Sequence, residues 1–218
     1  MLVIDAAPEA PRDCRRCPRL AAYRDETAAT QPGWFNGAVP SFGDPAAGLL
    51  VVGLAPGVRG ANRTGRPFTG DFAGDLLYAT LTRHGFANGA FDARPDDGLR
   101  LSDCLVTNAV RCVPPQNKPT TAEIAACRPF LAARIAATPH LRAIVALGRI
   151  AHDSVLRALG TKAKDAPFAH GARARLGGVT LFSSYHCSRY NTNTRRLTPE
   201  MFDSVFAAVR RELDAARG

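Results

Sequence analysis

Long apolar runs, a leader pattern and internal repeats are all missing from this sequence. No stretch of about eighteen consecutive apolar residues occurs, so we expect no membrane-spanning helix. The first ten residues lack a basic segment followed by an apolar one, which argues against a signal peptide. We therefore expect an intracellular, cytoplasmic protein, in a reducing compartment where clustered cysteines bind metal more often than they form disulfides.

Two common phosphate-binding motifs are missing as well. The first glycine-rich segment, Gly53-Leu54-Ala55-Pro56-Gly57, is not a G-x-G-x-x-G motif, and no Gly-Lys-Ser/Thr follows it as a P-loop requires. Taken alone, the segment is an ordinary turn after a strand, because glycine and proline mark turns in general.

The chain is long enough for one hydrophobic core and carries an excess of positive charge. With 218 residues and 46% hydrophobic content, we expect a single domain over residues 1–218. The 28 Lys and Arg outnumber the 19 Asp and Glu, for a formal net charge of +9. Most of the basic residues are arginine, which suits phosphate contacts. This balance fits an anionic polymer as partner, although many basic proteins bind none.

Four of the six cysteines form the most informative pattern. Cys14 and Cys17 make a C-x-x-C pair, and Cys112 and Cys127 follow far downstream. If the four converge, their thiolates suit either a tetrahedral zinc ion or an iron–sulfur cluster. A zinc ribbon needs a second closely spaced pair, which this chain lacks, and that favours a 4Fe-4S cluster over zinc. The alternative is an unrelated C-x-x-C pair with ordinary buried thiols.

Short apolar runs alternate with segments that have helical signals. A capping box at Thr120-x-x-Glu123 opens one helix, and Thr198-Pro199-Glu200 opens the last. Unbroken apolar runs predict a parallel sheet that is covered on both faces. We therefore predict an α/β fold, a three-layer α/β/α sandwich around a mainly parallel four-stranded sheet. The predicted strands are Leu49–Gly53, Cys104–Thr107, Ala143–Leu147 and Val179–Ser183, and the other helices are Gly74–His84 and Ile150–Leu159.

Polar and glycine-rich segments follow all four predicted strands. Because ligands of open α/β sheets bind at the carboxyl ends of the strands, these segments predict a functional cleft. Asn108 ends the second strand, where it is either a turn residue or an amide that donates and accepts at a cleft. His186 follows the fourth strand, and a structural role is the commoner fate for a lone histidine. Arg189, Arg195 and Arg196 lie just beyond it and suit phosphate contacts.

The segment Asn62–Asp71 (NRTGRPFTGD) completes a set of motifs that resembles a known family. A glycine/proline turn, a Thr-Gly-Arg-Pro-Phe segment, a strand-ending asparagine and a final histidine-led motif are similar to the uracil-DNA glycosylase superfamily. The four cysteines resemble its iron–sulfur branches, and the first two motifs resemble the B-type, or family 5, enzymes. The resemblance runs from Cys14 to Leu197. It departs at His186-Cys187-Ser188, where the family has His-Pro-Ser and the role of the thiol is open.

The resemblance implies a DNA glycosylase of base excision repair, which flips uracil out of DNA and releases it. It implies that Phe68 stacks on the base and Asn108 hydrogen-bonds its edge, with the backbone of Ala55, Pro56 and Gly57 around it. Because the first motif has no acid, Asp71 is our candidate catalytic carboxylate, and His186 our candidate donor to the leaving base. The motifs contain no lysine, so water is the expected nucleophile. The expected DNA contacts are Arg63, Arg66, Ser188, Arg189 and Arg195.

Several points stay open at this stage. Deaminated purines such as hypoxanthine and xanthine are further candidate bases, and the strand preference is undetermined. We expect a monomer, associated with the nucleoid, whose cluster joins the N-terminal segment to residues 112–127 and has a structural role. The alternatives are a non-catalytic DNA-binding module with a structural metal, an iron–sulfur electron carrier, and a relative that traps uracil-DNA covalently.

Overall fold

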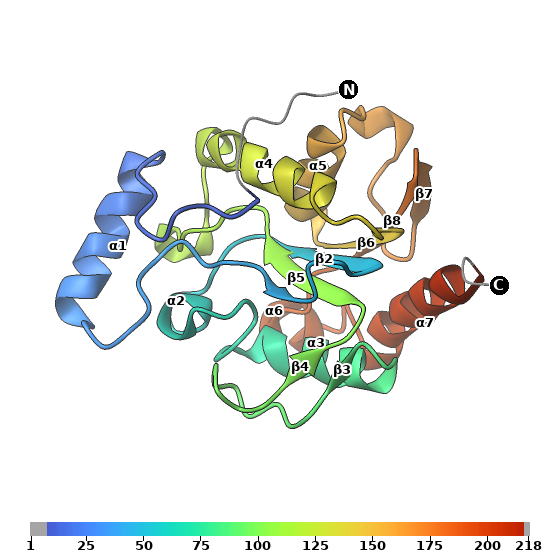
Figure 1. Cartoon of the computed structure of the whole chain (residues 1–218), viewed down its shortest axis with the longest axis horizontal. Coiled ribbons are helices and arrows are strands. Elements are labelled where there is room, and N and C mark those ends of the chain that lie inside the picture. The colour runs from blue at the N-terminus through green and yellow to red at the C-terminus, as the bar shows by residue number, and fades with distance from the viewer. Residues whose placement is uncertain (1–7, 216–218) are drawn as a thin grey trace.

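A computed structural model describes residues 8–215 as a six-stranded sheet between two layers of helices (Figure 1). The sheet has the strand order β1-β5-β2-β6-β8-β7. Its four central strands run parallel and coincide with the four predicted apolar runs. These strands are β2 (Leu49–Gly53), β5 (Cys104–Asn108), β6 (Ala143–Leu147) and β8 (Val179–Ser184).

The sheet is wider than the predicted four strands. Two antiparallel edge strands extend it, β1 (Phe42–Gly43) beside β5 and β7 (Arg173–Leu176) beside β8. Strand β1 is two residues long, and β7 alternates exposed arginines with half-buried apolar residues. Neither edge strand has the unbroken apolar run that marks a strand buried on both faces. A separate ribbon pairs β3 (Ala87–Asn88) with β4 (Arg100–Leu101).

Helices cover both faces of the sheet, which confirms the three-layer α/β/α sandwich. One face carries α3 (Phe72–Arg83) and α7 (Pro199–Ala215), and the other carries α4 (Thr121–Ala136) and α5 (Arg149–Ala158) (Figure 1). Side chains alternate between these two cores along each strand, as the period of a strand requires. The predicted apolar stripe of the last helix is buried against the first face: Phe202, Val205, Phe206, Val209 and Leu213.

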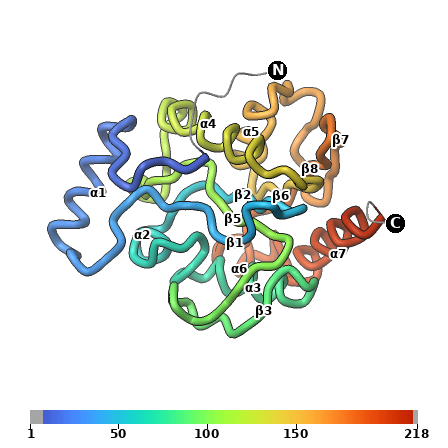
Figure 2. Tube along the Cα trace, in the orientation of Figure 1, coloured from blue at the N-terminus to red at the C-terminus, as the bar shows by residue number. Residues whose placement is uncertain are grey.

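Helix α1 (Pro18–Thr30) lies at one end of the molecule, away from the sheet (Figure 2). Its Leu20 packs with Ile124 and Phe130 of α4. The start of α4 has the predicted capping box, because Glu123 N–H donates to Thr120 Oγ1 and Thr120 N–H donates to Glu123 Oε2. The remaining short helices are α2 (Ala61–Thr64), α6 (Arg189–Asn193), η1 (Pro115–Asn117) and η2 (Ala163–Asp165).

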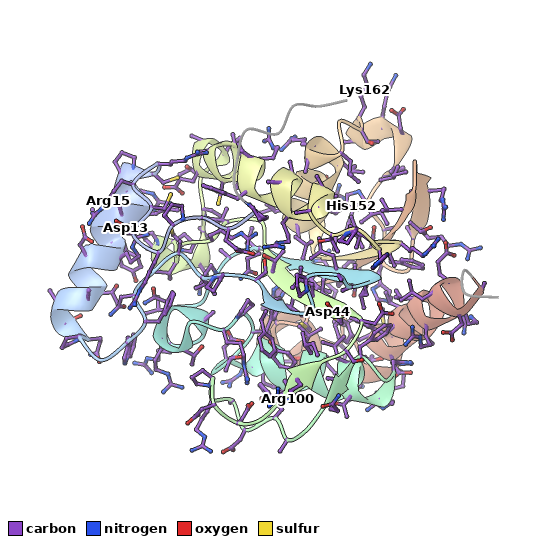
Figure 3. All side chains as sticks on the ribbon, in the orientation of Figure 1. Asp13, Arg15, Asp44, Arg100, His152 and Lys162 are labelled. Atoms are coloured by element: carbon purple, nitrogen blue, oxygen red, sulfur yellow. The ribbon has the colours of Figure 1, made fainter. Side chains whose placement is uncertain are left out.

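Charged side chains surround the molecule, and one histidine is built into its core. Lys162 and Arg100 are exposed, whereas His152, a residue of α5, is buried (Figure 3). The His152 ring bonds Ser183 Oγ and the Ala166 carbonyl at 2.9 Å each, a structural role. Across residues 8–215 no helix has the length and apolar content to span a membrane. The first seven residues, on which the prediction of no signal peptide mostly rests, lie outside the described part.

Candidate active site and cysteine cluster

The carboxyl ends of β2 and β5 bring two predicted base-binding residues together. Gly53 pairs with Asn108 in the sheet, and the N–H of Ala109 donates to the Gly53 carbonyl over 2.9 Å. A Cβ atom on Gly53 would overlap both the Asn108 side-chain oxygen and the Phe68 ring. Glycine at this position therefore lets Phe68 and Asn108 approach the same strand end. The Asn108 amide makes no side-chain hydrogen bond to another described residue, which leaves its donor and acceptor available to a ligand.

The Phe68 ring lies beside His186 and is held by its own loop. The two rings stack with centroids 6.0 Å apart and planes inclined by 25°. Phe68 has a left-handed backbone (φ +52°), a strained conformation for a bulky residue. Hydrogen bonds hold the backbone on each side of it, from the Tyr78 hydroxyl to the Pro67 carbonyl (2.6 Å) and from the Thr64 hydroxyl to the Thr69 carbonyl (3.1 Å). The ring is thereby oriented before any base arrives.

Asp71 precedes α3 and faces the glycine/proline turn after β2. A Cβ atom on Gly57 would lie 3.1 Å from one Asp71 carboxylate oxygen, and one on Gly60 would overlap it. The other oxygen is buried and has no hydrogen-bond partner in the described part of the chain. Burial raises the pKa of Asp71 above its usual value, against a smaller opposing effect of the Gly74 and Ala73 backbone N–H groups. The Asp71 carboxylate is therefore poorly solvated, and its unpartnered oxygen is available to interact with a positive charge.

His186 lies just beyond the carboxyl end of β8, with its ring stacked on that of Phe68. Burial lowers the pKa of His186 to about 4, because the charged imidazolium loses its hydration. The ring is therefore neutral at pH 7, with one N–H donor. Its ring nitrogens hydrogen-bond to no other residue in the range 8–215, and Asn191 Nδ2 donates to its backbone carbonyl over 2.8 Å.

The predicted DNA-contacting residues differ in exposure. Arg63, Arg189 and Arg195 are exposed, and the Arg189 guanidinium lies 5.2 Å from the centre of the Phe72 ring. Ser188 is half-buried, and its hydroxyl caps α6 by accepting from Asn191 N–H.

Arg66 was predicted to contact DNA, and the structure corrects this prediction. Its side chain is 5% exposed and donates two parallel hydrogen bonds to the Asp97 carboxylate, of 2.8 and 2.6 Å. Its Nε donates to Thr69 Oγ1, and its guanidinium lies over the rings of Phe42, Tyr78 and Phe91. A guanidinium already paired and covered in this way holds its own loop and is not exposed to DNA phosphates. The sequence shows the arginine but gives no sign of Asp97 as its partner.

Cys187 and Cys104 are buried and do not line the pocket of the other four cysteines. Cys187 has no exposed surface, and its sulfur lies 3.5 Å from the Ala73 carbonyl at the start of α3. Burial raises its pKa strongly, so the thiol stays neutral and packs against the helix that Asp71 precedes. Cys104 lies inside β5, as predicted.

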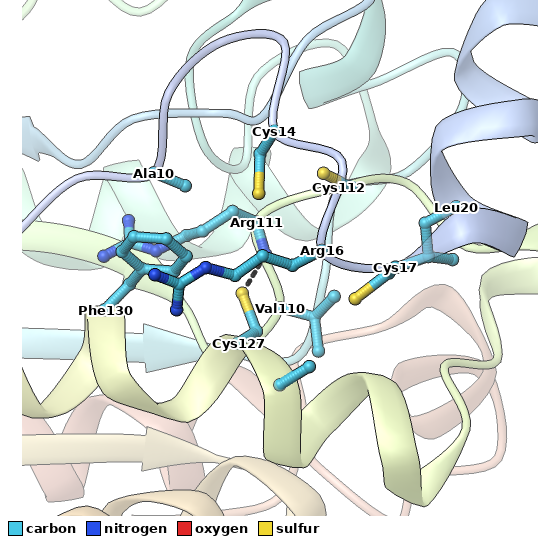
Figure 4. A pocket seen from close by; sticks show the side chains of 11 residues that line it. Ala10, Cys14, Arg16, Cys17, Leu20, Val110, Arg111, Cys112, Cys127 and Phe130 are labelled. Atoms are coloured by element: carbon cyan, nitrogen blue, oxygen red, sulfur yellow. Dashed lines mark hydrogen bonds between the residues drawn. The ribbon is translucent and has the colours of Figure 1, made fainter. Parts of the chain in front are cut away.

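The other four cysteines, Cys14, Cys17, Cys112 and Cys127, line one small pocket between the N-terminal segment and α4 (Figure 4). Their sulfurs point toward a common space, with Phe130 and Val110 among its apolar walls. Burial raises the pKa of Cys112 and of Cys17 above the usual thiol value, and it raises the pKa of Cys127 to about 11. Thiols in such a pocket ionise only when a cation compensates for the lost hydration.

Two arginines provide N–H groups to these sulfurs. Arg24 is 2% exposed, and its Nη1 donates to Cys112 Sγ over 3.1 Å. The backbone N–H of Arg111 donates to Cys127 Sγ over 3.3 Å (Figure 4). Sequence reasoning missed Arg24, because 88 positions separate it from the sulfur it contacts.

Comparisons with known proteins agree with this fold and these motifs. The family model of the uracil DNA glycosylase superfamily matches residues 40–210. The chain therefore belongs to the uracil-DNA glycosylase superfamily, as its motifs predicted.

Within this superfamily the chain is more similar to Type-5 than to Type-4 uracil-DNA glycosylases, such as the Type-4 enzyme of Pyrobaculum aerophilum at 33% identity over 80% of this chain and 78% of the relative. The chain is 46% identical to a Type-5 uracil-DNA glycosylase of Thermus thermophilus, over 91% of this chain and 93% of the relative. It is 45% identical to the Type-5 enzyme of Mycobacterium bovis (91% and 77% covered) and 40% identical to that of Pyrobaculum aerophilum (88% and 86% covered). These relatives confirm the predicted B-type, or family 5, branch.

Proposed function

We propose that this protein is a monofunctional DNA glycosylase that removes uracil from DNA by hydrolysis, in base excision repair. One observation carries the proposal: the Asp71 carboxylate, one oxygen of which is buried without a hydrogen-bond partner in the described residues, lies at the same sheet edge as Phe68, Asn108 and His186. The names of the Type-5 relatives support uracil as the base.

The pocket recognises a base that has been flipped out of the stack. A glycosylase needs this step because its target bond is inaccessible inside a duplex. The Phe68 ring stacks on the base and the Asn108 amide bonds its edge, where a donor and an acceptor together distinguish uracil from other bases. The backbone of Ala55, Pro56 and Gly57 closes the pocket, with Pro56 offering no N–H.

Cleavage of the N-glycosidic bond leaves the bonding electrons on the base and positive charge on the sugar. The Asp71 carboxylate stabilises that positive charge and orients the attacking water. Because it is poorly solvated, it interacts with a developing cation more strongly than an exposed carboxylate does. Water adds to the sugar carbon and gives its proton to solvent, and the base, which leaves with the bonding electrons, takes up a proton from solvent.

His186 stabilises the departing base. The neutral imidazole donates its N–H to the base oxygen on which negative charge develops. A neutral donor is suited to this role, because it needs no titration near neutral pH. No lysine lies in the motifs, so no Schiff base forms and the DNA strand stays intact after base release.

Exposed arginines bind the DNA backbone on both sides of the pocket. Arg63 lies on the Phe68 loop, and Arg189 and Arg195 lie in and after α6, where Ser188 caps the helix. The net charge of +9 favours the same partner through long-range attraction.

We propose further that Cys14, Cys17, Cys112 and Cys127 hold a 4Fe-4S cluster. The donor set fits this group, because four thiols line one pocket, and the two buried ones, Cys112 and Cys127, receive N–H donors from Arg24 and Arg111. When bound, such a cluster would supply the positive charge that ionises the thiols, and its four cysteines would join the N-terminal segment to α4.

The finer assignments follow from the same chemistry. We propose that the deaminated purines hypoxanthine and xanthine are further substrates, since they share with uracil a carbonyl beside a ring N–H. We also propose that the protein acts as a monomer in the cytoplasm, associated with the nucleoid where its DNA substrate lies.

The test is to incubate the protein with duplexes that each hold a single uracil, hypoxanthine or xanthine, and to measure released base and strand integrity. We expect free uracil and an intact strand that breaks only after alkali treatment. Binding without released base would instead indicate a DNA-binding module, and an adduct stable to denaturant would indicate covalent trapping.

A further inference from the structure

A buried arginine, Arg24, reaches the cysteine pocket from α1. Cys17 precedes this helix, and Arg24 lies about two helical turns further on. Because helical side chains lean toward the N-terminus of their helix, Arg24 extends back toward the pocket. Its Nη1 donates to Cys112 Sγ over 3.1 Å, and its Nη2 donates to the Cys14 carbonyl over 3.0 Å. One guanidinium therefore contacts both the N-terminal cysteine pair and the distant one.

Arg24 differs from the other buried arginines in having no carboxylate partner among residues 8–215. Each of the other three lies within 3.1 Å of a carboxylate oxygen, in the pairs Arg66–Asp97, Arg111–Glu9 and Arg134–Glu9. A guanidinium stays charged when it is buried, and a buried charge without a counter-charge is costly. Of the two groups that accept hydrogen bonds from Arg24, only the Cys112 sulfur can carry a full negative charge. The geometry therefore pairs Arg24 with a thiolate.

The four sulfurs of the pocket are not equivalent. Cys112 accepts from a charged donor, whereas Cys127 accepts from a neutral one, the backbone N–H of Arg111. Within the described part of the chain, the sulfurs of Cys14 and Cys17 accept no hydrogen bond. A hydrogen bond from a charged donor is about twice as strong as a neutral one. The strongest electrostatic support of the pocket thus acts on a single sulfur.

A fixed positive charge beside a sulfur ligand affects how easily a metal centre loses an electron. Hydrogen bonds to the sulfurs and the local charge are among the factors that set the reduction potential of an iron–sulfur cluster. Loss of an electron makes the centre more positive, and a neighbouring cation opposes that change. Since Arg24 is buried, salt in the solvent screens its charge little.

We propose that Arg24 is a positioning residue of the cysteine centre. It holds the Cys112 thiolate in place, raises the reduction potential of the centre, and so protects the centre from oxidation and loss of iron. The inference rests on the proposed 4Fe-4S cluster, and it assigns a role in maintaining that cluster to a residue outside the four cysteines. Base release is not involved.

The test compares the wild-type protein with Arg24→Gln, which removes the charge, and with Arg24→Lys, which keeps it. The one-electron midpoint potential of the iron centre is measured by voltammetry, and the release of iron to a chelator is followed in air. For Arg24→Gln we expect the ratio of reduced to oxidised centre at a fixed potential to fall about tenfold, which is a lowering of about 59 mV. Iron release should be about tenfold faster. Arg24→Lys should stay closer to the wild-type protein in both measurements.

Arg16→Gln is the matched control, because Arg16 is an exposed arginine that lines the same pocket. Its guanidinium lies 4.5 Å from the centre of the Phe130 ring, and within residues 8–215 it donates to none of the four sulfurs. Solvent screens the charge of this side chain, so the variant should keep the wild-type potential and rate of iron release.

Circular dichroism confirms that the variants are folded. An unchanged potential in an Arg24→Gln protein with full iron content overturns the inference, and so does an equal shift in Arg16→Gln. If Arg24→Gln holds no iron, iron retained by Arg24→Lys supports the role of the charge, whereas iron lost from both folded variants overturns it. The iron content of the wild-type protein separates these failures from a failure of the proposed cluster, and its release of uracil, measured in parallel, tests the proposed glycosylase activity independently.

Discussion

At the scale of single residues, burial acts in opposite directions on the two groups that we assign to catalysis. It raises the pKa of the Asp71 carboxyl and lowers the pKa of the His186 imidazole to about 4. Both shifts have the same cause, since a poorly solvated site disfavours the charged form of either group. Asp71 must be ionised to stabilise a cation. His186 needs only an N–H that can donate, and both the neutral and the charged imidazole have one. The pH dependence of the reaction therefore reports on Asp71.

We predict that the single-turnover rate of uracil release falls on the acid side, with a midpoint above the ordinary carboxyl value of 3.8. The sign follows because protonation removes the charge of Asp71, while His186 stays neutral until about pH 4. Rates measured from pH 4 to 9 test this. A step near pH 6.5 that His186→Gln abolishes would show instead that His186 titrates with an ordinary pKa.

The sequence predicts individual site residues unevenly. Phe68, Asn108 and His186 end up side by side because the motifs are anchored to strand ends whose positions the apolar runs define. The sequence gives no sign that Arg66 is buried, because its burial depends on pairing with Asp97, 31 positions away. Its prediction as a DNA contact was wrong for that reason. The pocket lined by Arg149, Phe168 and Arg196 is formed by three separate segments of the chain, and no local pattern contains that information.

At the scale of elements, the Phe68 loop depends on a buried ion pair with the segment before β4. Asp97 also accepts hydrogen bonds from the N–H groups of Asp92 and Leu99, which closes that segment against Arg66. The Arg66 guanidinium holds the pKa of Asp97 far below its usual value. Removing one partner of a buried pair leaves the other charge unpaired, and this loss costs more than the pair gains.

We predict that Asp97→Asn lowers the free energy of unfolding at pH 7 by about 3 kcal/mol or more, measured by denaturant titration. Because the folded pKa of Asp97 is depressed, the pair stabilises fully above the unfolded value of about 3.9 and is lost as pH falls through the folded pKa. The exposed neighbour Asp96 provides the control variant Asp96→Asn. Equal losses for the two variants would contradict this role of the pair.

The sequence predicts the helices and strands well where they are fully buried. The four parallel strands and the capped helices lie where apolar runs and cap residues placed them. The edge strands were missed, since a strand that is half exposed or two residues long has little apolar signal.

At the scale of the whole molecule, the loop after β2 connects the cysteine pocket to the proposed active site. Ala55 packs against the apolar residues around the cysteines, and Val110 N–H donates to the Leu54 carbonyl over 2.9 Å. A cluster there would stabilise the N-terminal segment and the base-binding loop together, without taking part in bond cleavage.

We predict about four iron atoms per chain after anaerobic purification, measured by metal analysis. Cys127→Ser should lose the iron and melt at a lower temperature, because the N-terminal segment is then no longer joined to α4. Cys104→Ala, which alters a buried cysteine outside the pocket, should keep it. A protein with no iron, or with one zinc at full occupancy, contradicts the cluster.

The most direct test of the account is the single-turnover release of uracil from a duplex by Asp71→Asn. We predict a rate about 100- to 1,000-fold below that of the wild-type protein, with DNA binding largely unchanged, because only the bond-breaking step needs the carboxylate. Asp75→Asn, an exposed acid in the first turn of the same helix, should keep the wild-type rate. Release by Asp71→Asn at the wild-type rate would contradict the account.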